Sequence, residues 1–146
     1  MASLMDTMDF GIINILKNNS RTPFLEIAKQ LKVSESTIRH RIGNMERHGV
    51  IKKYSLSVDP AKLGYGSVAL VGIDVQPEKF LYVAKKLTEF ENVKMVATTS
   101  GDHMIMTEIW GEKAAELRSF ISERIEKISG VTRTCPAIIN ETLKEG

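Results

Sequence analysis

The chain has 146 residues and a formal net charge of +2; 42% of its residues are hydrophobic and 26% charged, ordinary globular composition for one domain or two small ones. No apolar run approaches the ~20 residues that a membrane span needs, and residues 1–9 carry two aspartates without a basic cluster, so no secretory signal is predicted. Cys135 is the only cysteine, which excludes an intrachain disulfide and favours a cytoplasmic location.

The basic residues are concentrated in the first part of the chain. Residues 29–53 carry seven basic side chains against two acidic ones, a net charge of +5, whereas the residues from 62 onward have a net charge of −1. A basic front and a near-neutral rear are typical of a polyanion-binding module on a neutral scaffold. Charge alone also fits an ordinary solvated helix surface, so the interpretation depends on the elements that carry it.

Two short helices are predicted before residue 33. The first covers residues 8–18, where apolar side chains recur at helical spacing. The second begins after Thr22 as its cap and runs to about Lys32, because Pro23 fits a first helical position, where a backbone N–H would be unpaired anyway. The side chains expected to point inward are Phe10, Ile12, Ile13 and Leu16 in the first helix and Leu25, Ala28 and Leu31 in the second.

A third helix follows almost at once and predicts a helix-turn-helix. Val33 separates the second helix from Ser34, which is a good N-cap, and Gly49 suits the left-handed position after a last turn that reaches about His48. Such a short connection between the second and third of three helices is the signature of a helix-turn-helix. At about 100° per residue, the inward face of this helix contains Ile38, Ile42 and Met45.

The outward face of the third helix is the predicted DNA-reading surface. Recognition helices read base edges from their N-terminal residues. Ser36, Arg39 and His40 occupy those positions, and arginine suits guanine O6 and N7. Gly43 lies on the same face, where it permits a close approach but weakens the helix. Flanking basic residues are better placed for phosphates, and the full predicted set is Lys32, Ser36, Thr37, Arg39, His40, Arg41, Arg47, Lys52 and Lys53.

A domain boundary is predicted shortly after the helix-turn-helix. An extended, weakly alternating segment covers residues 50–58, and residues 59–66 contain one proline and two glycines, which break regular structure. We therefore expect a helix-turn-helix DNA-binding domain at residues 1–58, a hinge linker at residues 59–66, and a ligand-binding and oligomerisation domain at residues 67–146.

The rear domain is predicted to have the order strand, helix, strand, strand, helix, strand. The strands are expected at residues 66–76, 93–99, 104–110 and 131–143, and the helices after Pro77 and between Gly111 and Gly130. This βαββαβ order is ferredoxin-like, so the fold class is α+β, with a winged-helix-like helix-turn-helix domain before an αβ sandwich. A single helical layer leaves one sheet face uncovered, which favours self-association. Pro136 requires an edge strand or a bulge.

The ordered series of motifs resembles the Lrp/AsnC family, the leucine-responsive, feast/famine regulators of bacteria and archaea. The matching segments are Asp9-Phe10-Gly11-Ile12-Ile13, Arg21-Thr22-Pro23-Phe24, the run from Val33 to Ile42, the run from Glu46 to Tyr54, and Leu63-Gly64. The rear half is similar to that family's ligand-binding domain, so the resemblance covers nearly the whole chain. It implies a transcriptional regulator whose partners are double-stranded DNA and further copies of itself, as dimers and commonly octamers.

Residues 100–103, Ser-Gly-Asp-His, lie between two predicted strands. A plain hairpin turn explains them, because glycine accepts a positive φ and aspartate bonds to its own backbone. The resemblance implies a further role, in which this loop binds an amino-acid effector between subunits, with Asp102 on the ammonium and amides around Gly101 on the carboxylate. Family members often carry a second acid two positions later, where this chain has Met104. The predicted effector-binding residues are Thr98, Ser100, Gly101, Asp102 and His103, with Thr132, Arg133 and Thr134 as the alternative location.

Two other function classes stay open at this point. An enzyme on a ferredoxin-like fold would leave the basic helix-turn-helix unexplained, and the sequence contains no metal-ligand spacing, phosphate loop or set of nucleophile, base and orienting residue. Cys135 is interpreted as a structural thiol. An architectural DNA-packing protein of low sequence specificity, without an effector, is the stronger alternative. We predict a sequence-specific transcriptional regulator that is not an enzyme and needs no metal or cofactor.

Overall fold

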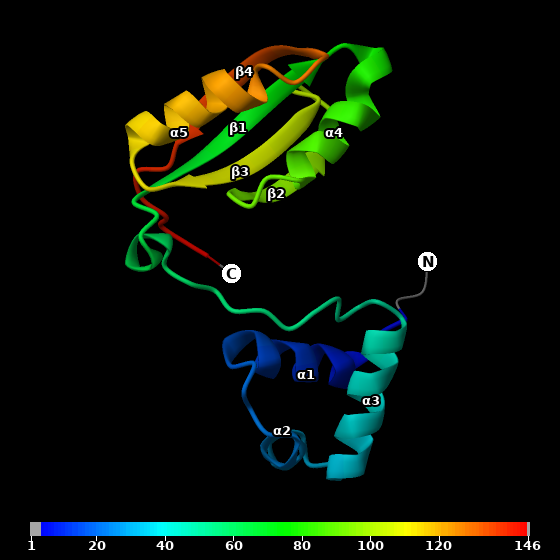
Figure 1. Ribbon diagram of the computed structural model, residues 1–146. Coiled ribbons are helices and arrows are strands. Elements are labelled where there is room, and N and C mark those ends of the chain that lie inside the picture. The colour runs from blue at the N-terminus through cyan, green and yellow to red at the C-terminus, as the bar shows by residue number, and fades with distance from the viewer. Residues whose placement is uncertain (1–3, 146) are drawn as a thin grey trace. The chain divides into compact units, whose positions relative to one another are not determined.

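The computed structural model describes residues 4–145, which form two compact units that divide between Ser57 and Val58 (Figure 1). The first unit contains α1, Thr7–Asn18, α2, Phe24–Leu31, and α3, Glu35–Arg47. The second contains a four-stranded sheet and its helices. Residues 1–3 and 146 of the predicted domains lie outside the described residues. Among residues 4–145, no helix is long and apolar enough to cross a membrane.

The caps of α2 and α3 are only partly those expected from the sequence. The Ser34 side chain accepts a hydrogen bond from the backbone N–H of Thr37, which confirms Ser34 as the N-cap of α3. The predicted cap of α2 is wrong, because Pro23 occupies the cap position itself. The Thr22 hydroxyl donates instead to the carbonyl of Asn19 at 2.7 Å and so closes the preceding turn.

The core of the first unit lies between its three helices. Ile38, Ile42 and Met45 are buried, which confirms the predicted inward face of α3. Most of the predicted inward residues of α1 and α2 are confirmed, since Ile12 and Ala28 are buried and Ile13, Leu16 and Leu31 pack against the core. Two are wrong, because Phe10 is 52% exposed and Leu25 is 53% exposed. The buried residues of these two helices that join the core are Ile12, Ile27 and Ala28.

A charged residue takes the core position of α1 that the sequence assigned to Phe10. Asp9 lies one helical turn before the buried Ile12 and is itself only 8% exposed. Its carboxylate accepts a hydrogen bond from the Arg41 side chain of α3 at 3.0 Å, and a carboxylate can be buried at low cost only with such a partner. The apolar pattern of the sequence therefore points to Phe10, although the packed face runs through Asp9.

The segment predicted as a hinge is ordered at its C-terminal end. Residues 52–59 have no regular secondary structure. Pro60–Leu63 then form a short 310 helix, and the side chain of its N-cap, Asp59, accepts a backbone hydrogen bond. The N–H of Gly66 donates to the carbonyl of Glu112 at 3.1 Å, which ties this part of the chain to the second unit.

The second unit has the predicted βαββαβ order. Its elements are β1, Ser67–Val75, α4, Phe80–Thr88, β2, Val93–Thr98, β3, Ile105–Gly111, α5, Ala114–Phe120, and β4, Val131–Ile138. A 310 turn, Pro77–Lys79, precedes α4, and a π-helical turn, Ile121–Ile125, continues α5. The strands are antiparallel in the order β2-β3-β1-β4, as a ferredoxin-like fold requires. The last strand ends at Ile138 and not at Leu143.

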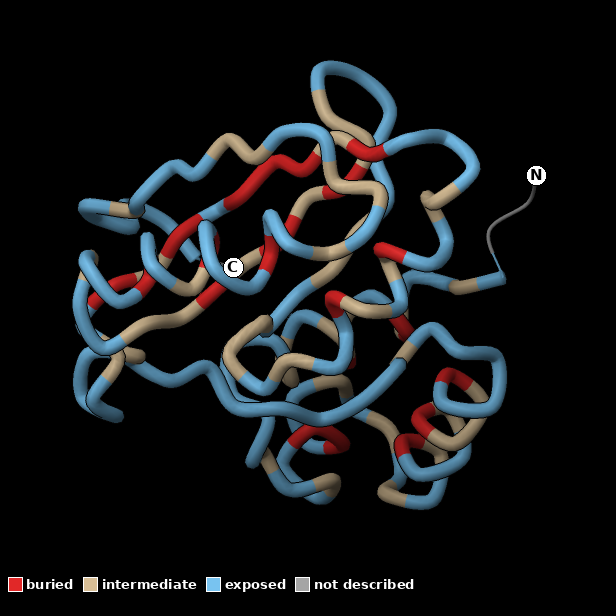
Figure 2. Tube along the Cα trace, turned by 45° about the horizontal axis from the view of Figure 1, so that its top comes forward, coloured by how far each residue is buried: buried red, intermediate tan, exposed pale blue. Residues whose placement is uncertain are grey.

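The helices α4 and α5 cover the same face of the sheet (Figure 1). Ala69, Val71 and Ile73 of β1 are fully buried beneath them, and buried residues follow the central strands in Figure 2. Because side chains alternate along a strand, the intervening residues and their cross-strand partners lie on the opposite face, which we call the outer face. It comprises Leu70, Gly72 and Asp74 of β1, Met106, Glu108 and Trp110 of β3, Met95 and Ala97 of β2, and Arg133, Cys135 and Ala137 of β4. Pro136 lies on the edge strand β4, as predicted.

Candidate nucleic-acid interface and effector loop

The N-terminal end of α3 holds two of the predicted DNA-binding residues, Ser36 and Thr37. The Ser34 hydroxyl is 3.0 Å from the Ser36 hydroxyl and 2.8 Å from the Thr37 hydroxyl. The same Ser34 oxygen accepts the Thr37 backbone N–H at 3.2 Å. The helix cap therefore fixes the hydroxyl groups of Ser36 and Thr37 at the end of α3, from which recognition helices contact base edges.

Arg39 lies on the flank of α3 that borders α2. Its side chain is 65% exposed and donates to the Glu35 carboxylate at 2.7 Å. Its guanidinium carbon lies 5.2 Å from the centroid of the Phe24 ring. Exposed ion pairs of this kind contribute about 0–1 kcal/mol. Arg39 can therefore exchange Glu35 for a DNA group at small cost.

A polar network occupies the next two turns of α3. The Asn44 side-chain amide lies 3.2 Å from His40 Nε2, Arg47 donates to Asn44 Oδ1, and His48 Nδ1 lies 2.8 Å from the Asn44 carbonyl oxygen. Asn44 thus contacts His40 and Arg47 through its side-chain amide and His48 through its backbone carbonyl. The sequence analysis missed Asn44 and His48, although His40, Asn44 and His48 follow one another at successive spacings of four residues and so lie on one helical stripe.

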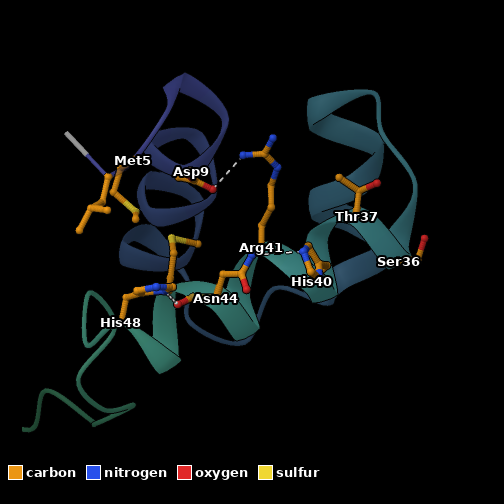
Figure 3. A pocket seen from close by; sticks show the side chains of 10 residues that line it. Met5, Asp9, Ser36, Thr37, His40, Arg41, Asn44 and His48 are labelled. Atoms are coloured by element: carbon orange, nitrogen blue, oxygen red, sulfur yellow. Dashed lines mark hydrogen bonds and ion pairs between the residues drawn. The ribbon is translucent and has the colours of Figure 1, made fainter. Parts of the chain in front are cut away.

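These side chains border a hollow of about 600 Å³ in the first unit, between α3, the beginning of α1 and the residues before it (Figure 3). It is lined by Leu4, Met5, Asp9, Ser36, Thr37, His40, Arg41, Asn44, Met45 and His48. In Figure 3, His40, Asn44 and His48 follow one another along α3, with Ser36 and Thr37 near its N-terminal end. The hollow thus adjoins the outward, polar face of the helix.

Arg41 has an internal role. It donates to Asp6 at 2.7 Å and to Asp9 at 3.0 Å, and its side chain is 28% exposed. The hydrogen bond from Arg41, with the backbone N–H of Asp9, holds the pKa of the Asp6 carboxyl below its usual value. Its charge therefore fastens α1 to α3, so the guanidinium is already engaged within the unit.

The basic residues predicted to bind phosphates flank α3 on both sides. Lys32, in the turn between α2 and α3, adopts a left-handed conformation with a φ of 57°. Lys52 and Lys53 are exposed in the segment after α3. The Tyr54 hydroxyl next to them donates to Glu46 at 2.8 Å, and burial, followed by this bond to Glu46, raises the pKa of Tyr54 to about 12. The Tyr54–Glu46 bond thus holds the segment against the last turns of α3.

The loop between β2 and β3 is closed by its own backbone and one side chain. The N–H of Thr99 donates to the carbonyl of Met104 at 2.9 Å, and the Thr99 hydroxyl donates to the carbonyl of His103 at 2.6 Å. Gly101 has a φ of 130°, a conformation that favours glycine. Met104 is half-buried and packs against the core of the second unit, so an acidic side chain here would be partly desolvated.

His103 anchors this loop to the outer face of the sheet. A Cβ atom at Gly72 would lie 2.2 Å from His103 Cδ2, so the imidazole fills the space that the glycine leaves. His103 Nδ1 lies 3.3 Å from the Asp74 carboxylate. Asp74 of β1 lies directly opposite Arg133 of the neighbouring strand β4. The sheet therefore brings His103, Asp74 and Arg133 to one end of its outer face.

The remaining predicted effector residues lie at the same end of the sheet but differ in their contacts. Within residues 4–145, the side chains of Asp102 and Arg133 are exposed and form no hydrogen bond or ion pair. Thr134 is paired with Ile73 on the helical side of the sheet, and its hydroxyl donates to Glu126 at 2.6 Å. Thr98 ends β2, Ser100 lies in the loop, and Thr132 lies near the beginning of β4.

Comparisons with known proteins match both units. Residues 5–52 match a family model described as winged helix-turn-helix DNA-binding, and residues 67–146 match one described as a C-terminal dimeric alpha+beta barrel domain. The chain is 48% identical over 141 residues to the HTH-type transcriptional regulator LrpA of Pyrococcus horikoshii, an alignment that covers 97% of this chain and 100% of the relative.

Solved structures share the fold over almost the full length. Escherichia coli AsnC has a TM-score of 0.88 at 27% identity, with 98% of this chain and 97% of that chain covered. A Neisseria meningitidis transcriptional regulator in complex with L-Met has a TM-score of 0.85 at 17% identity, with 97% and 93% covered.

Proposed function

The chain belongs to the Lrp/AsnC family of transcriptional regulators, and from this premise we propose that the outward face of α3 reads its operator and that a small amino acid modulates the response. The family makes the protein a sequence-specific DNA-binding regulator with a dimeric rear domain. The observation that carries the proposed interface is the ordered polar surface of α3, opposite the buried Ile38, Ile42 and Met45.

The proposed interface divides into base-reading and phosphate-binding parts. Ser36, Thr37, Arg39 and His40 reach base edges from the first turns of α3, and Asn44 joins them because asparagine pairs with adenine N6 and N7. Phosphates are bound by the basic side chains on either side of α3, which are Lys32, Arg47, Lys52 and Lys53. This division predicts that the first group sets sequence preference and the second sets the salt dependence of binding.

Site selection from a random DNA library tests the interface. Arg39→Ala should weaken binding to the selected site by ~1–3 kcal/mol and relax the preference at one position, whereas Lys52→Ala should weaken all sequences about equally and reduce the salt slope by about 1. Arg118→Ala, exposed on α5 of the second unit, is the control. If Arg39→Ala leaves both the selected sequence and the affinity unchanged, α3 does not read DNA as proposed. A uniform footprint without bounded sites would instead favour the DNA-packing alternative.

The proposed effector site is the loop between β2 and β3 together with the start of β4. Asp102 offers an unpaired carboxylate for an ammonium group, and the amides around Gly101 and the Arg133 guanidinium offer partners for a carboxylate. A zwitterionic amino acid matches this combination of charges. The complex of a structurally similar regulator with L-Met lends further support.

Calorimetric titration of the twenty amino acids and their close relatives tests the effector. An amino acid that binds can shift assembly or DNA affinity only as far as it binds one assembly or conformational state of the protein more tightly than the other. Asp102→Ala should abolish that shift and leave ligand-free DNA binding intact, while Glu123→Ala, an exposed acid on the π-helical turn, should change neither. Absence of any binder at millimolar concentration contradicts the effector proposal. Full affinity in Asp102→Ala would exclude the loop from the site and leave only its second part, Thr132, Arg133 and Thr134 at the start of β4.

A further inference from the structure

Within residues 4–145, neither a contact nor the backbone conformation requires a glycine at position 43. It lies in the interior of α3, where glycine is about 1 kcal/mol less favourable than alanine. Gly49 has a φ of 70°, and a Cβ at Gly11 would lie 3.2 Å from the Leu31 side chain, so both of these glycines have local explanations. A Cβ at Gly43 would meet nothing within 4 Å, and its φ is not positive.

The surroundings of Gly43 indicate what approaches it. Residues three and four positions apart are neighbours on a helix surface, so Gly43 is flanked by Arg39 and His40 on one side and by Glu46 and Arg47 on the other. All four flanking side chains are exposed, and the Glu46 carboxylate accepts a hydrogen bond from Tyr54. Gly43 therefore forms the floor of a notch between long side chains, with one arginine on each side, on the helix face that points away from the core.

We propose that Gly43 is a specificity-determining residue at which the backbone of α3 touches the edge of a base pair in the major groove. The inference rests on the proposed α3 interface and deepens it. Without a Cβ, the helix can enter the groove far enough for Arg39 and Arg47 to reach DNA on either side of the contact. A side chain at this position would hold the helix away from the bases, so the cost to helix stability is offset in the complex with DNA.

Gly43→Ala and Gly43→Leu separate this role from a structural one, because both substitutions favour the helix. In the full chain, Gly43→Ala should raise the melting temperature of the helical unit by about 4–8 °C. Its affinity for the sequence that the wild type selects should fall by roughly 5- to 150-fold, the range of one base contact, and Gly43→Leu should lose more. Affinity for unrelated duplex DNA should change little, because phosphate contacts dominate it.

Asn14→Ala is the matched control, since Asn14 is exposed on α1 and alanine there also favours a helix. It should stabilise the unit without changing selection or affinity. If the wild type selects a sequence and both Gly43 variants bind it with wild-type affinity, the inference fails while the interface stands. If the wild type selects no sequence, both fail. A stabilised Gly43→Ala protein with weakened specific binding supports the inference, because a merely structural glycine cannot produce that combination.

Discussion

Arg39 and Arg41 are two positions apart on α3, yet their guanidinium groups have different surroundings. Arg39 is exposed and pairs with Glu35 one turn earlier, whereas Arg41 bridges to α1 through Asp6 and Asp9. Sequence pattern could not separate them, because both are basic residues on a predicted recognition helix. The distinction depends on Asp9, whose burial could be seen only once the helices were packed.

The two arginines should therefore have opposite mutational effects. Arg41→Ala should lower the free energy of unfolding of the first unit by about 1–3 kcal/mol, because the buried Asp9 carboxylate loses its charged donor. Arg39→Ala should change it by less than about 0.5 kcal/mol, as exposed substitutions usually do, while weakening DNA binding. Urea unfolding followed by far-UV circular dichroism measures both. Equal destabilisation by the two substitutions would contradict the internal role of Arg41.

The same contact predicts a pH dependence. Arg41 lowers the pKa of Asp6 below the ordinary value of 3.8, so the ionised carboxylate stabilises the fold above that pH. The stabilisation is lost as the pH falls below 3.8 and through the lowered pKa of the folded state. Between about pH 7 and pH 3, the free energy of unfolding should fall less for Arg41→Ala than for the wild type. A parallel decline in both proteins would argue against the pairing.

At the scale of elements, the sequence predicted the order and type of helices and strands well. Local chemistry, which a sequence carries directly, explains the N-cap at Ser34, the positive φ of Gly49 and the place of Pro136 on an edge strand. The π-helical turn Ile121–Ile125 was not predicted. It keeps Ile121 and Ile125 buried with Leu117, and apolar residues at a spacing of four fit an α-helix just as well.

The candidate sites were predictable in outline but not in their contacts. The outward face of α3 that we propose for recognition followed from helical spacing, while the His40–Asn44–Arg47 network required side-chain positions. The Gly-Asp loop followed from its turn composition and the family resemblance. Its anchor did not, because the contact between His103 and Gly72 joins residues that are distant in the sequence.

The anchor of the β2–β3 loop can be tested by a double-mutant cycle. Gly72→Ala should destabilise the second unit by about 1–3 kcal/mol, because the new methyl group overlaps the His103 ring. In a His103→Ala background the same substitution should cost much less, which gives a coupling energy of about 0.5–3 kcal/mol. Urea unfolding followed by Trp110 fluorescence reports on this unit, since Trp110 is the only tryptophan. Additive costs would mean that the ring does not rest on Gly72.

At the scale of the whole molecule, the outer face of the sheet is an apolar surface that no helix covers. The helices cover one face, and the outer face presents Leu70 and Met95, each 37% exposed, beside Met106 and Trp110. Apolar side chains gathered on one sheet face are typical of an interface. Residues 67–146 match a dimeric domain, which agrees with the self-association predicted from a single helical layer. We propose that a second copy covers the outer face.

The outer face can be identified as the dimer interface by a pair of matched substitutions. Leu70→Glu places a charge in the centre of this face and should shift the protein to monomers at micromolar concentration, because an unpaired charge cannot be buried cheaply. Leu81→Glu is the control, since Leu81 is 78% exposed on α4, on the opposite side of the sheet. Analytical ultracentrifugation measures the assembly of both variants, and circular dichroism confirms that both remain folded.

Because dimeric helix-turn-helix proteins bind two half-sites together, Leu70→Glu should also bind the selected DNA more weakly than Leu81→Glu does. A folded Leu70→Glu protein that remains dimeric would mean that the copies associate through another surface.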